Sequence, residues 1–448
     1  MSGVSAGSPG PRLDGALFDR VDAHLAHADR ELLDRYPGER FVRRPIHTVY
    51  VPASRFAPDT VAQWGSRALA LLDEHAFDPA AFAGAFGIGA DQAAALRSRV
   101  RAKLVAEPIE DLRVDFEDGY GMPGDDREDA DARAAGRALA NLAGPTGPTG
   151  STGLSGPGSP SFLGIRFKSL EAPTRRRGLR TLDLVLGEVL ASGPLPPGWT
   201  VTLPKVTSVE QVEAMVIVLE ALESQYGLAT GRLRFEVQVE TAQAILGADG
   251  TALVARMVHA GAGRVSGLHY GTYDYSAGLG IAAAYQSLEH PAADHAKAVM
   301  QLAAAGTGVR VCDGSTNVMP TGPAQAVLAA WQLHARLVAR ALERGYYQGW
   351  DMHPGHLPSR YAATYRFYAD GVEAACARVR AYVDGTGLGV VDEPATAQAL
   401  AAFLVRGLHC GALDPAEVSA ATGLVQAGLD ALLDRRFTPT AAGEGGRP

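Results

Sequence analysis

Two acidic residues stand where segments of strand-like sequence end. Phe235–Val239 alternates apolar and polar residues and runs directly into Glu240. Val265–Leu268 leads to Asp274, which lies 34 positions after Glu240 (274 minus 240). If the two segments are successive parallel strands, their carboxyl ends meet at the same edge of the sheet. Two carboxylates placed there can hold one hard divalent cation. The spacing therefore predicts a site for Mg²⁺ or Mn²⁺ with Glu240 and Asp274 as ligands. For each residue alone, a solvated or ion-paired role is the alternative.

Other strand-like segments also end in residues that suit substrate binding, namely Asp115, Glu117, Arg166 and Lys205. An arginine holds a carboxylate through two parallel hydrogen bonds, so we predict that Arg166 binds a substrate carboxylate and that the other three also contact substrate. A divalent cation beside such an arginine suits enolate chemistry, in which a 2-oxo acid is polarised while a C–C bond is broken or formed. Two alternatives stay open. Asp115 could pair with a cation within the sheet, and Lys205 suits an ion pair better than a Schiff base.

Eight segments have the length and composition of strands, and stretches rich in alanine and leucine separate them. The clearest helical stretches are Val209–Tyr226 and Pro323–Glu343. Eight alternations of strand and helix predict a parallel sheet, and eight is the number that closes a (β/α)8 TIM barrel. A doubly wound open sheet is the alternative, but no glycine-rich first turn supports it. The predicted strands are Thr48–Val51, Leu112–Phe116, Gly164–Phe167, Thr200–Leu203, Arg234–Val239, Val265–Leu268, Gly308–Cys312 and Gly349–Met352.

The chain is long enough for a barrel with additions at both ends. We predict an N-terminal extension over residues 1–40, the barrel over residues 41–360 and a C-terminal helical cap over residues 361–436, followed by a disordered tail over residues 437–448. Within the barrel, the long Pro52–Asp111 connection should carry extra helices. Residues 144–160 repeat glycine triplets too few times for a collagen helix and are predicted to form a disordered loop.

Bulk composition excludes several classes of function. The formal net charge of −8 argues against nucleic acid as a partner. No apolar run approaches the roughly 20 residues of a membrane span, and residues 1–10 have neither the basic nor the apolar region of a signal peptide. The three widely separated cysteines predict neither disulfides nor a metal cluster. These features predict a cytoplasmic protein.

Eight short motifs also occur in the order found in the HpcH/HpaI aldolase and citrate lyase beta-subunit family, which includes the malyl-CoA lyases, and the chain resembles that family from about Val49 to about Pro394. Ile46 and Lys168 depart from the pattern, because the family usually has an arginine and an asparagine at these positions. The motifs are Tyr50-Val51-Pro52, Val114–Gly119, Ile165-Arg166-Phe167, Leu203–Val206, Val239–Ala242, Tyr270–Asp274, Gly349–Pro354 and Val390–Pro394.

The resemblance implies a (β/α)8 barrel and a Mg²⁺-dependent C–C lyase or aldolase. Its substrate would be a hydroxy acid or hydroxyacyl-CoA, with a 2-oxo acid of the glyoxylate or pyruvate type as product or co-substrate, so coenzyme A could be part of the substrate. In the acyl-CoA members, the aspartate of the C-terminal motif acts in a neighbouring subunit. The resemblance therefore implies that Asp392 is catalytic together with Arg166, in a homo-oligomer that would be a trimer or hexamer. As an alternative, Asp392 could cap the helix that begins near Pro394.

Two other functions remain open from the sequence. The barrel could have lost catalysis and serve as a regulatory protein that binds a metabolite or coenzyme A. It could also be a lyase of the phosphoenolpyruvate type, which would require a phosphate site that the sequence does not locate.

Overall fold

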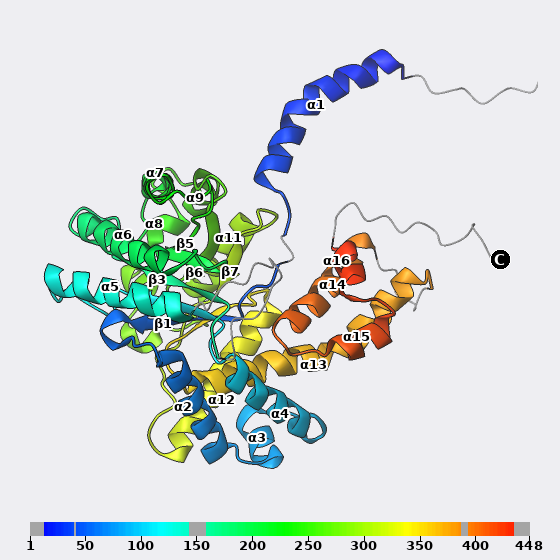
Figure 1. Ribbon diagram of the computed structural model, residues 1–448. Helices are drawn as coiled ribbons and strands as arrows, with labels where there is room; N and C mark the ends of the chain where they lie inside the picture. Colours follow the sequence, from blue (N-terminus) through cyan, green and yellow to red (C-terminus); the bar gives the residue numbers. More distant parts are fainter. Residues whose placement is uncertain (1–12, 40–41, 143–157, 387–392, 434–448) are drawn as a thin grey trace, which may run out of the picture.

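Eight parallel strands form a single sheet in the order β7-β6-β5-β4-β3-β2-β1-β8 (Figure 1). The computed structural model describes residues 13–39, 42–142, 158–386 and 393–433. A parallel bridge between Cys312, at the end of β7, and Gln348, just before β8, joins the two edges of the sheet. The predicted (β/α)8 barrel is confirmed, and the open-sheet alternative is wrong because the first and last strands are neighbours.

Each predicted strand is present, with both bounds within two residues of the prediction. Their short runs of β-branched and apolar residues are buried almost throughout, as expected for parallel strands that are covered on both faces. The strands are β1 (His47–Pro52), β2 (Asp111–Asp115), β3 (Phe162–Arg166), β4 (Trp199–Leu203), β5 (Phe235–Val239), β6 (Val265–Tyr270), β7 (Arg310–Cys312) and β8 (Gly349–Asp351).

Local sequence signals also determine where the helices around the barrel begin and end. The clearest case is α7, whose bounds match the prediction; it starts with a capping box between Ser208 and Gln211 and ends at Gly227, which has a left-handed φ of 65°. The barrel helices that follow the strands are α5 (Asp125–Leu142), α6 (Arg175–Ser192), α7 (Val209–Tyr226), α8 (Ala242–Ile245), α9 (Leu253–Ala260), α10 (Thr272–Gly278), α11 (Pro291–Ala304), α12 (Ala324–Glu343) and α13 (His356–Val383).

The long connection between β1 and β2 carries extra helices, as predicted. They are α2 (Thr60–His75), α3 (Pro79–Phe86) and α4 (Ala90–Ala106). Leu72, Phe82 and Leu96 are buried there, and the three helices lie beside α12 and α13 (Figure 1). This addition therefore extends the hydrophobic core of the barrel.

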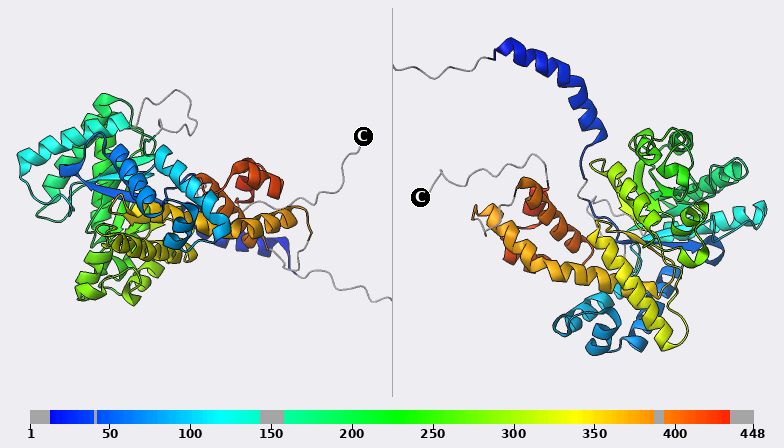
Figure 2. Two further views of the ribbon diagram at one scale, coloured as in Figure 1. Left: turned by 90° about the horizontal axis from the view of Figure 1, so that it is seen from below. Right: turned by 180° about the vertical axis from the view of Figure 1, so that it is seen from behind.

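A helical unit follows the barrel at the C-terminal end. Its helices are α14 (Pro394–His409), α15 (Pro415–Thr422) and α16 (Gln426–Leu432), and the long helix α13 connects it to the barrel (Figures 1 and 2). Because α13 begins at His356, the predicted boundary between residues 360 and 361 falls inside this helix. The predicted tail, most of the 144–160 loop and Asp392 lie outside the described residues.

At the other end of the chain, α1 (Gly15–Arg35) projects away from the barrel and has no buried residue (Figures 1 and 2). Over the four described ranges, no helix is both long and apolar enough to cross a membrane. The three cysteines are buried free thiols.

The interior of the barrel is charged as well as apolar. The fully buried guanidinium of Arg113 donates to Asp111, and its Nη2 lies 2.7 Å from Glu236 Oε1. Glu236 Oε2 also lies 3.2 Å from Nε2 of His269. Alternation along β5 thus turns Glu236 into the barrel, and by the same period Gln238 and Glu240 follow it on the same face. Glu240, which directly follows β5, therefore lies at the mouth of the barrel.

Candidate metal and substrate site

The candidate site lies at the C-terminal ends of the strands, where the active sites of such barrels are found. Glu117 and Asp118 follow β2, Lys205 follows β4, Glu240 follows β5, and Asp274 lies in the first turn of α10 after β6. Ion pairs among these side chains, described below, show that the fold brings them together. The order of the strands around the barrel is the reason, because β2 to β6 are consecutive neighbours.

Three carboxylates form a cluster that suits a cation. Asp118, Glu240 and Asp274 each offer one oxygen, and these oxygens all lie within 4.8 Å of one another. Mg²⁺ takes oxygen ligands at about 2.0–2.1 Å in an octahedron and usually keeps several waters. An oxygen set of this spread can close on one such ion with small side-chain movements. The sequence predicted Glu240 and Asp274 as metal ligands, and the structure adds Asp118 to this cluster, in a loop three residues beyond β2.

The carboxylate of Glu240 is held from two sides. Its Oε1 accepts a hydrogen bond of 2.7 Å from the backbone N–H of Lys205, and its Oε2 accepts one of 2.6 Å from Nε2 of Gln238. Gly271, after β6, leaves it the space it needs, since a Cβ there would stand 2.5 Å from Cβ of Glu240. Glu240 is only 2% exposed. Its position is therefore fixed before any ligand binds.

Lys205 occupies the centre of the acidic cluster. Its Nζ donates to Asp274, and it lies 2.9 Å from Asp118 Oδ2 and 3.4 Å from Glu240 Oε2. The backbone of Lys205 has a φ of 52°, a left-handed conformation that is uncommon for a residue other than glycine. Burial opposes the charge of the ammonium group, but the carboxylates of Glu240 and Glu117 outweigh it and raise the pKa of Lys205. Lys205 thus forms ion pairs here.

Negative charge exceeds positive charge in the cluster. Burial, reinforced by the charge of neighbouring carboxylates, raises the pKa of Glu240 to about 8 and that of Glu117 to about 7, although Lys205 and Arg166 act in the opposite direction. Burial also opposes the charge of Asp274, but its contact with Lys205 lowers its pKa. Four carboxylates therefore share the ammonium group of Lys205 and one edge of Arg166, and a divalent cation would relieve the repulsion among them. By ligand type, spacing and charge, these residues fit Mg²⁺ or Mn²⁺.

Arg166 lies beside this cluster and is oriented by Asp115. Its Nε and Nη2 donate to Asp115 Oδ1 and Oδ2 at 2.7 and 2.8 Å. The same two oxygens accept hydrogen bonds of 3.0 Å from the backbone N–H groups of Glu117 and Gly119. A Cβ at Gly119 would stand 2.8 Å from Asp115 Oδ2, so this turn requires glycine. Because its oxygens are fully engaged, Asp115 acts on Arg166, and its predicted contact with substrate stays a prediction.

The remaining edge of Arg166 faces the acidic residues. Its Nη1 lies 3.2 Å from Gln238 Oε1 and 3.4 Å from Glu117 Oε2. The aromatic rings of Tyr50 and Trp350 also flank the guanidinium group, with ring centres 4.9 and 5.4 Å from Cζ. A substrate carboxylate would therefore meet Nη1 first, with the Nε edge already occupied.

Two further residues that the sequence analysis named do not belong to this cluster. Asp392, the predicted catalytic residue beyond the barrel, is outside the described residues. Lys168 stands where the family that the chain resembles usually has an asparagine. It is buried and donates to Glu128 and to the carbonyl of Phe116 at 2.6 and 2.9 Å. It thus tethers the β2–α5 segment that carries the acidic residues.

The sequence matches one protein family over most of its length. Residues 25–437 match the domain of unknown function DUF6986. The chain belongs to this family. No curated protein has a sequence that matches it.

Several solved structures are similar to the structure of this DUF6986 protein. A citrate lyase from Burkholderia xenovorans LB400 is 18% identical, with a TM-score of 0.54 over 84% of this chain and 96% of that one. Protein CitE from Mycobacterium tuberculosis, in complex with magnesium, acetoacetate and coenzyme A, is 18% identical, with a TM-score of 0.47 over 83% of this chain and 100% of that one. Malate synthase from Haloferax volcanii, as a magnesium and glyoxylate complex, is 13% identical, with a TM-score of 0.45 over 72% and 76%. The first of these confirms, for the fold, the predicted resemblance to the citrate lyase family.

Proposed function

We propose that this DUF6986 protein is a Mg²⁺-dependent C–C lyase or aldolase. The observation that carries the proposal is the cluster of Asp118, Glu240 and Asp274, whose oxygens lie within 4.8 Å of one another beside Arg166. The barrel shared with a citrate lyase is consistent with it. The substrate would be a hydroxy acid or a hydroxyacyl-CoA, and a 2-oxo acid of the glyoxylate or pyruvate type would be the product or co-substrate.

Each part of the site would have one role. Asp118, Glu240 and Asp274 would hold the cation, which when bound would supply positive charge to stabilise a developing enolate. Arg166, oriented by Asp115 and flanked by Tyr50 and Trp350, would bind the carboxylate of the 2-oxo acid through Nη1. Lys205 and Glu117 would contact the substrate, with Lys205 leaving the carboxylates when the cation enters.

We also propose that Asp392 acts as general acid or base in a neighbouring copy of the chain. Ala395, three residues beyond it, lines a cavity together with Ile46 and Gln348, which directly precede β1 and β8 at the N-terminal end of the barrel. The metal residues lie at the opposite end of the strands, which supports action on another subunit of a homo-oligomer.

The test is a metal-dependent activity screen of the full chain. Glyoxylate, pyruvate and their hydroxy-acid adducts would be assayed with and without acetyl-CoA, in Mg²⁺ and in EDTA, and Mn²⁺ binding would be measured in parallel. Activity that needs the metal and is lost in Glu240→Gln is expected. Metal binding without any turnover would instead favour a regulatory barrel that binds metabolites.

A further inference from the structure

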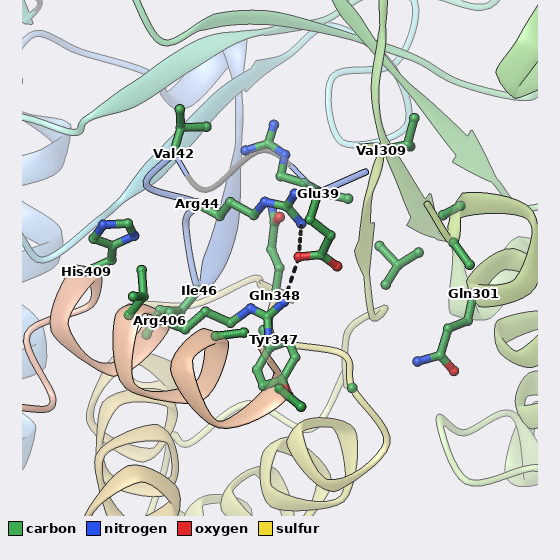
Figure 3. Close-up of a pocket in the computed structure, with 18 of the residues that line it drawn as sticks. Glu39, Val42, Arg44, Ile46, Gln301, Val309, Tyr347, Gln348, Arg406 and His409 are labelled. Atoms are coloured by element: carbon green, nitrogen blue, oxygen red, sulfur yellow. Dashed lines mark hydrogen bonds and ion pairs between the residues drawn. The ribbon is translucent and has the colours of Figure 1, made fainter. Parts of the chain in front are cut away.

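A cavity lies at the N-terminal end of the barrel (Figure 3), whereas the acidic cluster lies at the C-terminal ends of the strands. Its volume is about 450 Å³, within the range of about 300–1,000 Å³ typical of small-molecule sites. It is enclosed by the residues that precede β1 and β8, by the start of β7, by the end of α11 and by one face of α14. None of its lining residues belongs to the site described above.

Among its described lining residues, this cavity has more cationic than anionic side chains. The guanidinium groups of Arg44, Arg310 and Arg406 line it, and Glu39 is the one carboxylate among its described lining residues. Figure 3 shows the Glu39 carboxylate between Arg44 and Arg406, and the distances to their guanidinium groups are 3.8 and 2.8 Å. Since Glu39 is 44% exposed, solvent screens it and it neutralises the cluster weakly.

The third arginine has its own partial partner. Arg310 Nη2 lies 3.6 Å from Glu236 Oε1, but that same oxygen lies 2.7 Å from the guanidinium of Arg113. The three pocket arginines are only 12–24% exposed. Burial, together with the charges of Arg310 and Arg406, lowers the pKa of Arg44 to about 10 although Glu39 acts against this. Among the residues that the structure describes, the cluster therefore holds more positive charge than the nearby carboxylates balance.

Apolar residues, here called the apolar wall, also line the cavity, and one aromatic ring adjoins an arginine. The Tyr347 ring centre lies 4.3 Å from Cζ of Arg406, so the guanidinium group lies over the ring in a cation–π contact. The apolar wall is formed by Val42, Ile46, Val309, Val311, Ala402 and Val405. A ligand that fits would have an anionic head and a short apolar body.

We propose that this cavity binds a small molecule that carries a phosphate group. A phosphate monoester has a charge of about −1.5 to −2 near neutral pH, which matches the guanidinium groups of Arg44, Arg310 and Arg406. Of these, Arg44 and Arg406 also contact Glu39. Its oxygens accept paired hydrogen bonds from guanidinium groups. The cavity is separate from the proposed lyase site, so this proposal does not depend on the proposed activity.

Binding can be tested with inorganic phosphate and phenyl phosphate as probes. Calorimetry on the full chain in EDTA, at constant ionic strength, should give a Kd near or below the millimolar range, with phenyl phosphate bound more tightly than phosphate because its ring meets the apolar wall. Arg406→Gln should weaken both by at least tenfold. Arg166→Gln, which alters the barrel mouth, should leave both unchanged.

A variant that leaves the arginines intact separates binding from folding. Ala399 is exposed on α14 and lines the cavity, so Ala399→Glu should be tolerated by the helix and place a competing carboxylate in the site. Ala399→Gln is its uncharged control. We expect loss of phosphate binding in the first and retention in the second. No binding of either probe to the wild type, equal binding by both Ala399 variants, or binding of malonate alone would overturn the proposal.

Discussion

Asp115 and Arg166 are partners in register on β2 and β3, and their side chains meet through two hydrogen bonds of 2.7 and 2.8 Å. The side chain of each residue is 3% exposed. A carboxylate that accepts from both Nε and Nη2 fixes the plane of the guanidinium group. The donor that faces the acidic cluster is then Nη1, which is the group that would bind a substrate carboxylate in the proposed function.

Replacing Arg166 by lysine should severely impair activity. The ammonium group keeps the charge but cannot hold Asp115 with two bonds while also presenting a donor to the substrate. Removing one partner of a buried charge pair typically costs about 2–5 kcal/mol, so kcat/KM should fall by about 30-fold or more. Steady-state kinetics would measure this. Arg180→Lys, at an exposed ion pair with Asp129, is the matched control and should retain full activity. Kinetics close to those of the wild type in Arg166→Lys would refute the role.

The three carboxylates should contribute to metal affinity. Glu240→Gln and Asp274→Asn remove charged ligands, so each should weaken Mn²⁺ binding by at least tenfold, and Asp118→Asn should weaken it as well. Calorimetry or the paramagnetic signal of free Mn²⁺ would report the affinity without any assay of turnover. Asp249→Asn, on an exposed aspartate paired with Arg256, serves as the control. If Glu240→Gln and Asp274→Asn both bind Mn²⁺ like the wild type, the metal site is assigned wrongly.

Much of this arrangement could be predicted from local sequence. The alternation along Phe235–Val239 fixed which side chains enter the barrel, and strand ends located Glu240 and Asp274 at one edge. Asp118 could not be placed in the same way, because it lies in a loop whose path depends on the turn at Gly119. The position of Lys205 depends on a backbone φ of 52°, which no periodicity predicts.

The N-terminal cavity was likewise outside the reach of sequence patterns. Its arginines lie before β1, at the start of β7 and on α14, so residues from 44 to 406 meet only after the barrel has closed and the C-terminal helices have packed. No spacing along the chain signals such a cluster. The eight-strand count predicts the barrel but says nothing of what covers its N-terminal end.

The acidic cluster should make the metal-free protein less stable as pH rises. Burial raises the pKa of Glu240 to about 8, above its unfolded value near 4.5, so between these values the folded state binds the extra proton. Stability is then fully present below about pH 4.5 and is lost as pH rises toward 8, by an amount of the order of a few kcal/mol. Melting temperatures in EDTA from pH 5.5 to 8.5 should fall in the wild type and fall less in Glu240→Gln. Saturating Mg²⁺ should flatten the wild-type curve. Parallel curves for the two proteins in EDTA would contradict the raised pKa.

Complementation between inactive variants tests the proposed role of Asp392 in a neighbouring subunit. Asp392→Asn should be inactive because it lacks the general acid or base, and Glu240→Gln because it lacks a metal ligand. A hybrid oligomer would pair an intact Glu240 in one subunit with an intact Asp392 from another, so mixing the two proteins should restore part of the activity. The alternative role of Asp392 as a helix cap meets a different residue at that position, because the N-cap of α14 is Glu393. If Asp392 has no part in catalysis, Asp392→Asn should keep much of its activity. Subunit exchange would be verified with differently tagged proteins. Exchange without recovery of activity would rule out catalysis across the interface.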